Sequence, residues 1–348
     1  MGGHSSKEGV AVSLEHLKLL TDSVGVIQHA LYGIPRRCTG YTTDDNARAL
    51  IALARCSNVC PSREIEGLAS IYLSFLHDAQ ETTGWFRNLM NYDRTWMDPE
   101  RGDEDSLGRA FWALAEVEIS DLPESQKAAA RHMSARAAPL LSELSSPRAL
   151  ALALLGCTLS SDSAGARFRK DAINSLRKRL CECYDAASSH DWPWFETYLT
   201  YCNARLPASL FAAYRRTGNA RFLPVAEDTT SFLTEITFVE GVLQPIGNAG
   251  WFVKGGKRAF YDQQPVDASA STELYVQAYH ATGKPMYSEL AHRGYSWYLG
   301  ANIHRLPLAD VGKGACYDGL TPEGVNLNQG AEACTTFLMA TLALNSLA

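Results

Sequence analysis

Apolar residues recur at three- and four-residue spacing through almost every long segment of the chain, which is the periodicity of α-helices. Half of the predicted helices have one apolar and one charged face and suit the outside of a core. They span residues 12–31, 62–79, 124–142, 165–186, 219–236 and 285–299. The other half consist almost wholly of small or apolar residues and must be buried on all sides. They span residues 45–56, 105–118, 147–157, 203–216, 268–282 and 329–347.

The two kinds of helix alternate with a period of roughly 40–65 residues, which is typical of a repeat architecture. An all-α (α/α)6 barrel is the arrangement that buries the apolar set completely, and the Ala, Gly and Ser residues of that set would let its helices approach closely around the axis. No linker rich in Pro, Gly or Ser divides the chain. We therefore expect one domain over residues 1–348, with residues 1–10 flexible. Strand-like alternation is confined to residues 239–245 and 251–261, which could pair as a hairpin.

Charge and composition exclude several classes of protein. The net charge of −6 argues against a nucleic-acid surface, which needs a basic stripe. No apolar run approaches the ~20 residues of a membrane span, and no signal peptide precedes the first helix, so we expect a cytoplasmic location. The nine cysteines are scattered without paired CxxC units, and we interpret them as free thiols in a reducing compartment. No nucleotide-binding or metal-binding motif is present, so we expect neither a cofactor nor a metal.

The connections between helices are unequal in length and composition. The loops that lead from an amphipathic helix to the next apolar helix are long and rich in aromatic and acidic residues; they include residues 84–105, 190–203, 240–267 and 302–329. Loops of this length in a compact domain are usually functional. All of them should emerge at the N-terminal ends of the apolar helices, where backbone N–H groups and positive potential suit a polar ligand. The barrel should therefore carry long loops and a ligand site at one end.

Aromatic and polar side chains are mixed in these loops in the manner of a carbohydrate site. Sugar rings present flat C–H faces to aromatic rings, while their hydroxyl groups bond to carboxylates, amides and arginines. We expect Trp85, Trp96, Trp194 and Trp251 to stack on sugar rings, although about half of the loop aromatics could instead cap the barrel core. The side chains expected to bind hydroxyl groups are Asp44, Arg87, Asn88, Asn203, Arg205, Gln263, Gln264, Gln329 and Glu332.

Glycoside cleavage normally needs two carboxyl groups across the scissile bond. Glu196 follows three aromatic residues and a proline, and this apolar setting would raise its pKa as a general acid requires. Asp45, Asp105 or Asp262 could be the opposing carboxylate. Helix capping is an equally good interpretation of Asp44, Asp105 and Asp267.

Several segments resemble a known group of proteins. The chain is similar, from about Leu19 to its end, to six-hairpin glycosidase-like proteins that often occur beside, or fused to, microbial glycosyltransferases. The resemblance implies an (α/α)6 barrel, a role in oligo- or polysaccharide metabolism and a glycosyltransferase encoded nearby as a partner, but it implies no particular substrate. It is carried by residues 42–48 (TTDDNAR), 105–110 (DSLGRA), 194–196 (WFE), 199–207 (LTYCNARLP), 245–252 (PIGNAGWF), 261–265 (YDQQP) and 325–332 (VNLNQGAE).

The preferred hypothesis is a metal-independent glycoside hydrolase that acts on an oligosaccharide or on the end of a polysaccharide. A phosphorylase would need an anion site, for which Arg87, Arg94 and Lys254 are the loop cations available. A non-catalytic glycan-binding or glycosyltransferase-accessory module would bind sugar without turnover. A sugar epimerase or isomerase would rely on pocket histidines, and no apolar helix begins with one; His29 reads as a polar contact at a helix end.

Overall fold

The computed structural model describes residues 9–98, 101–159 and 166–348. Most of the segment expected to be flexible, residues 1–10, lies outside the described residues. Val10 is described, and its backbone exchanges two hydrogen bonds with the side chain of Asn345 near the C-terminus.

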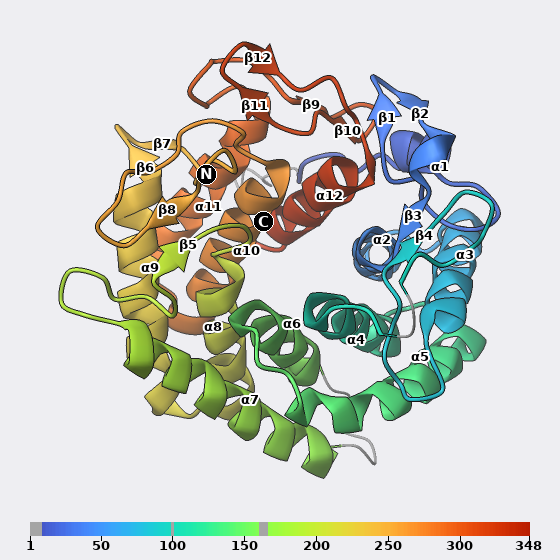
Figure 1. The fold of residues 1–348 in the computed structure, drawn as a ribbon, viewed down its shortest axis with the longest axis horizontal. Coiled ribbons are helices and arrows are strands. Elements are labelled where there is room, and N and C mark those ends of the chain that lie inside the picture. The colour runs from blue at the N-terminus through green and yellow to red at the C-terminus, as the bar shows by residue number, and fades with distance from the viewer. Residues whose placement is uncertain (1–8, 99–100, 160–165) are drawn as a thin grey trace, which may run out of the picture.

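Six helices form the inner ring of the molecule. Each packs against the next in chain order, and α12 packs back against α2, so the ring is closed (Figure 1). The inner helices are α2 (Thr43–Ser57), α4 (Glu104–Ile119), α6 (Pro147–Thr158), α8 (Arg205–Thr217), α10 (Pro265–Thr282) and α12 (Ala331–Asn345).

The remaining α-helices lie outside this ring, each beside the inner helix next to it in the chain, with α1 beside α12. They are α1 (Glu15–Leu20), α3 (Arg63–Ala79), α5 (Glu124–Ala137), α7 (Ala166–Ala187), α9 (Leu223–Thr237) and α11 (Pro285–Ser296). Short 3-10 turns cover Arg37–Thr39, Ala138–Ser142, Ala220–Phe222 and Trp297–Leu299. The predicted (α/α)6 barrel is confirmed.

Small residues set the spacing of the inner ring. Gly108 of α4 faces the backbone of α6: an added Cβ would lie 2.8 Å from the carbonyl oxygen of Ala149. At Gly156 of α6, an added Cβ would lie 2.9 Å from the ring of Phe111 in α4. Because neither glycine has a side chain, the two helices can approach closely enough to bury both of their facing sides.

The first predicted helix is much shorter than its apolar pattern indicates. Helix α1 ends at Leu20, and the carboxylate of Asp22 accepts the backbone N–H groups of Val24 and Gly25, which fixes a turn instead of a further helical turn. A Cβ at Gly25 would lie 2.5 Å from the side chain of Asn46, so the chain passes close to α2 here. The prediction of a helix over residues 12–31 is therefore wrong beyond Leu20.

Short strands tie the long loops together around the N-terminal ends of the inner helices. The expected pairing of residues 239–245 with 251–261 is wrong, because β6 pairs with β7 within the first segment and β8 pairs with β5 of an earlier loop. All pairs are antiparallel: β1 (Ala30–Leu31) with β2 (Ile34–Pro35), β3 (Tyr41–Thr42) with β4 (Leu89–Met90), β5 (Tyr198–Leu199) with β8 (Phe252–Val253), β6 (Phe238–Val239) with β7 (Val242–Leu243), β9 (Ala309–Asp310) with β10 (Ala315–Cys316), and β11 (Leu320–Thr321) with β12 (Gly324–Val325).

Within the described residues, no helix has both the length and the apolar character needed to cross a membrane. The nine cysteines are all free thiols.

Candidate active site

A cavity of about 640 Å³ opens at the N-terminal end of the inner ring. Its walls come from the starts of α2, α4 and α12 and from the loops before α6 and α8, so residues distant in sequence share one space. The residues that line it are Asp44, Arg48, Asp103, Glu104, Asp105, Ser145, Ser146, Tyr201 and Glu332.

Helix α2 begins with the adjacent aspartates at the mouth. Thr42 caps the helix by accepting the N–H of Asp45 at 2.9 Å. Asp44 accepts from Arg109 Nε at 2.8 Å and lies 3.7 Å from Arg48. Burial alone would raise the pKa of Asp44, but the two guanidinium groups outweigh it and lower the pKa. Asp44 is therefore held as a carboxylate.

Arg48 connects three carboxylates beneath the cavity. Besides Asp44, it contacts Asp45 at 3.1 Å and Glu332 of α12 at 2.9 Å. Burial raises the pKa of Asp45 to about 6, with Arg48 acting against the rise and the charge of Glu332 adding to it. One guanidinium shared among three acids leaves part of their charge uncompensated.

Asp105, in the first turn of α4, has the opposite electrostatic character to Asp44. Its carboxyl group accepts hydrogen bonds from the hydroxyl groups of Tyr201 at 2.7 Å and Ser146 at 3.2 Å. Burial raises the pKa of Asp105, and the nearby charge of Asp44 contributes to the rise. The cavity therefore holds, on neighbouring helices, one acid that stays ionised and one that retains its proton more readily.

The capping interpretation of three aspartates is wrong. Helix α4 is capped by Asp103, whose carboxylate accepts the N–H of Ser106 at 2.7 Å. Asp44, Asp105 and Asp267 lie inside the first turns of α2, α4 and α10, two or three residues beyond the caps. Their carboxyl groups are thus available for other interactions.

Two further carboxyl groups with raised pKa values were not among the predicted catalytic residues. Asp267 accepts the N–H of Cys202 at 2.7 Å, and burial raises its pKa to about 7. Asp318 accepts from Asn328 at 3.0 Å, and burial, followed by the charge of Glu332, raises its pKa to about 7. The position of Asp267 at the start of a predicted inner helix was a usable signal, whereas Asp318 lies in a loop and is half-buried only by the packing of that loop.

Glu196 lies in an ion pair rather than in an apolar pocket. Arg148 of α6 donates to its carboxylate at 2.7 Å, and the same guanidinium bonds to the side chains of Thr200 and Asn203. Glu196 is not among the described residues that line the cavity. The general-acid role of Glu196 stays a prediction, and the fold adds to its surroundings a guanidinium that the neighbouring sequence did not indicate.

The predicted polar binding residues divide into two groups. Asn88 lies near the cavity, bonding to the backbone of Asp44 and to Asp103, while Glu332 lines the cavity itself. Asp44, already described, lines it as well. The others serve the framework or the rim. Arg87 pairs with Glu81, Arg205 pairs with Glu273, and the side chain of Asn203 exchanges two hydrogen bonds with the backbone of Thr200. Gln263 bonds to Phe260 and Trp297, Gln264 precedes α10, and the backbone of Gln329 bonds to His16. Asp262, predicted as a possible opposing carboxylate, bonds through its backbone to Leu320.

The four tryptophans predicted to stack on sugar rings differ in how much ring surface they expose. Trp194 is 0% and Trp85 is 5% exposed, so both rings belong to the core and leave no face open for a sugar. Trp96 is half-buried against Phe75. Trp251, at 41% exposed, is the one whose ring is available at the surface in this conformation.

A histidine does reach the mouth of an inner helix, contrary to the sequence interpretation. His29, from the loop after α1, lies beside Gly330 at the start of α12, and Asn328 Nδ2 lies 3.0 Å from its Nδ1. Burial lowers the pKa of His29, against the influence of Glu332. The sequence could not show this contact, because it joins residues about three hundred positions apart.

Searches with protein-family models and against curated proteins give no match. Solved structures do match over nearly the whole chain. A D-mannose isomerase is 12% identical, with 96% of this chain and 95% of that chain covered and a TM-score of 0.74. Cellobiose 2-epimerase from Bacillus thermoamylovorans is 12% identical, with 97% and 96% covered and a TM-score of 0.73. The α-1,6-mannanase GH76A from Salegentibacter sp. is 10% identical, with 96% and 97% covered and a TM-score of 0.64. Such low identity shows the shared six-hairpin glycosidase-like fold and no more.

Proposed function

We propose that this protein is a glycoside hydrolase whose acid and base are carboxyl groups at the starts of α4 and α2. The observation that carries the proposal is that two carboxyl groups of one cavity have opposite partners: Asp44 is bonded to the guanidinium of Arg109, whereas Asp105 is bonded to the hydroxyl groups of Tyr201 and Ser146. These surroundings lower the pKa of Asp44 through the guanidinium groups and raise that of Asp105 through burial. Two carboxyl groups with opposed environments supply the two roles that glycosidic cleavage needs.

Each role follows from the contacts of the side chain. Asp105, oriented by Tyr201 and Ser146, would donate its proton to the glycosidic oxygen as the bond breaks. Asp44, kept ionised by Arg109, would face the developing positive charge at the anomeric carbon and either accept a proton from water or attack directly. We assign the acid to Asp105 in place of Glu196, because Asp105 lines the cavity, whereas Glu196 is paired with Arg148 and is not among the described residues that line it.

The solved structures of similar fold suggest which sugars to try first. One of them is an inactive variant of the mannanase, with two adjacent aspartates replaced by asparagine, in complex with α-1,6-mannotriose. This chain also places adjacent aspartates, Asp44 and Asp45, at a helix start beside its cavity. Mannose-containing oligosaccharides are therefore the first substrate class to test.

The test is product analysis by mass spectrometry and reducing-end assay on an oligosaccharide panel that includes α-1,6-mannotriose. Asp105→Asn and Asp44→Asn should each lower turnover by roughly 10²- to 10⁴-fold. Asp121→Asn, at an exposed position after α4, is the matched control and should leave turnover unchanged. Saturable sugar binding without product would instead favour a non-catalytic glycan-binding or glycosyltransferase-accessory module. Asp105→Asn within a few-fold of the wild type would refute the assigned acid.

Phosphorolysis is less well supported than hydrolysis. Of the predicted loop cations, Arg87 pairs with Glu81, Lys254 donates to the backbone of Ala187, and none of the three lines the cavity among its described residues. Turnover should therefore not depend on phosphate.

A sugar epimerase or isomerase is the second candidate, favoured by the position of His29. Burial lowers the pKa of this imidazole, and a neutral imidazole beside Glu332 could remove a proton from a carbon next to a carbonyl group. Such an activity gives a product of unchanged mass that takes up deuterium from D₂O. Deuterium uptake that is lost in His29→Asn and retained in Asp105→Asn would replace the hydrolase proposal.

A further inference from the structure

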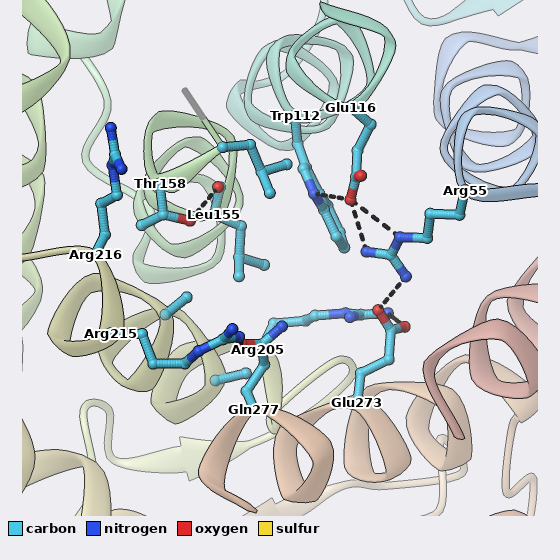
Figure 2. Close-up of a pocket in the computed structure, with 13 residues that line it drawn as sticks. Arg55, Trp112, Glu116, Leu155, Thr158, Arg205, Arg215, Arg216, Glu273 and Gln277 are labelled. Carbon is cyan, nitrogen blue, oxygen red and sulfur yellow. Dashed lines mark hydrogen bonds and ion pairs between the residues drawn. The ribbon is translucent and has the colours of Figure 1, made fainter. Parts of the chain in front are cut away.

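A second cavity, of about 240 Å³, lies at the other end of the inner ring (Figure 2). Its walls come from α2, α4, α6, α8 and α10, largely from their C-terminal halves. The ionised side chains that line it are Arg55, Arg205, Arg215, Arg216, Glu116 and Glu273. Arginines therefore outnumber carboxylates among the described lining residues.

Both carboxylates of this cavity are already engaged. Glu116 Oε1 accepts from Arg55 Nε at 3.0 Å, from Arg55 Nη2 at 2.7 Å and from Trp112 Nε1 at 3.0 Å. Glu273 accepts from Arg55 Nη1 at 2.9 Å and from Arg205 Nη2 at 2.6 Å. Figure 2 shows the guanidinium of Arg55 between the two carboxylates. Arg55 therefore pairs with both carboxylates, and Arg205 pairs with Glu273.

Arg215 has no carboxylate partner within the described chain. Its one hydrogen bond runs from Nη1 to the amide oxygen of Gln277 at 3.0 Å. Partial burial lowers the pKa of Arg215, and no acidic group acts against this effect. Because Gln277 accepts through its oxygen, its amide nitrogen remains as a second donor at the cavity wall.

A third donor lies deeper in the same cavity. Arg205 is 2% exposed and lines the cavity, yet its Nε has no hydrogen-bond partner in the structure. A buried N–H without an acceptor costs free energy that a bound acceptor can recover. The carbonyl groups at the ends of α2 and α8 offset part of the positive charge, but that influence falls off within the last helical turn.

We propose that this cavity binds a phosphate group, with Arg215, Gln277 and Arg205 as its donors. The planar fork of a guanidinium matches the oxygen geometry of phosphate. A cavity of 240 Å³ is smaller than the ~300–1,000 Å³ of sites for drug-sized molecules, so the ligand is inorganic phosphate or a small phosphorylated sugar. The site is distinct from the carboxylate cavity and does not depend on the proposed hydrolase activity.

The first experiment is isothermal titration of the full chain, at constant ionic strength, with inorganic phosphate, mannose 6-phosphate and mannose. Phosphate should bind with 1:1 stoichiometry and raise the unfolding temperature, whereas the same concentration of chloride should not. Tighter binding of the sugar phosphate would identify a phosphorylated sugar as the ligand. Equal affinities for the two phosphates would identify free phosphate.

Two variants and a control locate the site. Arg215→Gln should weaken phosphate binding by at least about tenfold, since it removes a charged donor. Gln277→Glu should abolish binding, because a carboxylate 3.0 Å from Arg215 would occupy the guanidinium internally. Arg221→Gln removes the same charge from an exposed position after α8 that is not among the described lining residues, and it should leave the affinity unchanged.

Absence of phosphate binding to the wild-type chain overturns the proposal. Equal binding by the wild type, Arg215→Gln and Gln277→Glu overturns it as well, because the bound anion would then lie elsewhere. Neither variant removes a residue of the carboxylate cavity, so these results leave the hydrolase proposal unaffected.

Discussion

The two ends of the barrel carry cavities lined by the same types of charged residue in opposite proportions. Described residues lining the N-terminal cavity include five carboxylates and one arginine, whereas those lining the C-terminal cavity include four arginines and two glutamates. The sign at each end matches the helix macrodipole, which favours acids at helix N-termini and bases at C-termini. The same inner helices therefore present an acidic surface at one end and a basic surface at the other.

The comparison shows that burial alone does not decide the protonation of an acid. Asp45 and Glu273 are both buried and both contact arginine. The pKa of Asp45 rises to about 6, while that of Glu273 falls to about 2. Burial opposes ionisation at both, but Glu273 contacts two guanidinium groups, those of Arg205 and of Arg55, which Glu273 shares with Glu116. Asp45 contacts only the guanidinium of Arg48, which it shares with two other acids. The number of guanidinium groups in contact with each carboxylate therefore decides whether its pKa rises or falls.

The largest loss of stability is expected from a substitution in the cavity at the C-terminal end of the inner ring. Glu273→Gln leaves Arg55 and Arg205 without this carboxylate, and breaking a buried ion pair typically costs about 3–5 kcal/mol of unfolding free energy. The loss should be measurable by urea denaturation at pH 7. Glu289→Gln breaks an exposed pair on α11 and should cost less than about 1 kcal/mol. If Glu273→Gln lost no more stability than Glu289→Gln, the carboxylate of Glu273 would not be needed to stabilise the buried arginines.

The pH dependence of that stabilisation has a defined sign. Because the folded pKa of Glu273 is below its unfolded value, its contribution is present at neutral pH. It is lost as the pH falls from the ordinary glutamate value towards about 2. The difference between wild type and Glu273→Gln should shrink over the same range.

At the N-terminal end of the inner ring, Asp267 should give a pH dependence of stability with the opposite sign to that of Glu273. The folded pKa of Asp267, about 7, is above its unfolded value, so the unfolded chain loses its proton first as pH rises. Stability therefore falls between pH 4 and pH 7, by at most about 4 kcal/mol from this group. Asp267→Asn retains an acceptor for Cys202 and should be more stable than the wild type at pH 8 but not at pH 4. Asp78→Asn, exposed on α3, should not alter the pH profile; a wild-type-like profile for Asp267→Asn would mean that Asp267 is ionised in the folded state.

The smallest effect concerns the choice between the two candidate acids. The hydroxyl of Tyr201 lowers the pKa of Asp105, so Tyr201→Phe should raise that pKa and move the alkaline limb of kcat/KM to higher pH. Tyr198→Phe is the matched variant, because the hydroxyl of Tyr198 bonds to Glu196. A shift of the limb in Tyr198→Phe, and none in Tyr201→Phe, would return the acid role to Glu196.

Much of the architecture followed from local sequence pattern. The segments of mainly small and apolar residues became the inner helices, with boundaries close to those predicted, because a helix with so little polar surface is stable only where neighbours cover it. The main error, the length of the first helix, arose from a turn that the Asp22 side chain stabilises. The cluster of carboxylates at one end could also be predicted. Because inner and outer helices alternate along the chain, all inner helices run in the same direction and begin at the same end of the ring.

The chemistry of the individual groups required the tertiary structure. Sequence alone indicated that Asp44, Asp105 and Asp267 lie at helix starts, but not that Arg109 would keep Asp44 ionised. It placed Glu196 among aromatic residues, and the fold brought Arg148 against it. Helical periodicity depends on neighbours three and four positions away and is written in the sequence. The pKa of a carboxyl group depends on which guanidinium groups approach it across the ring, and only the closed barrel determines that.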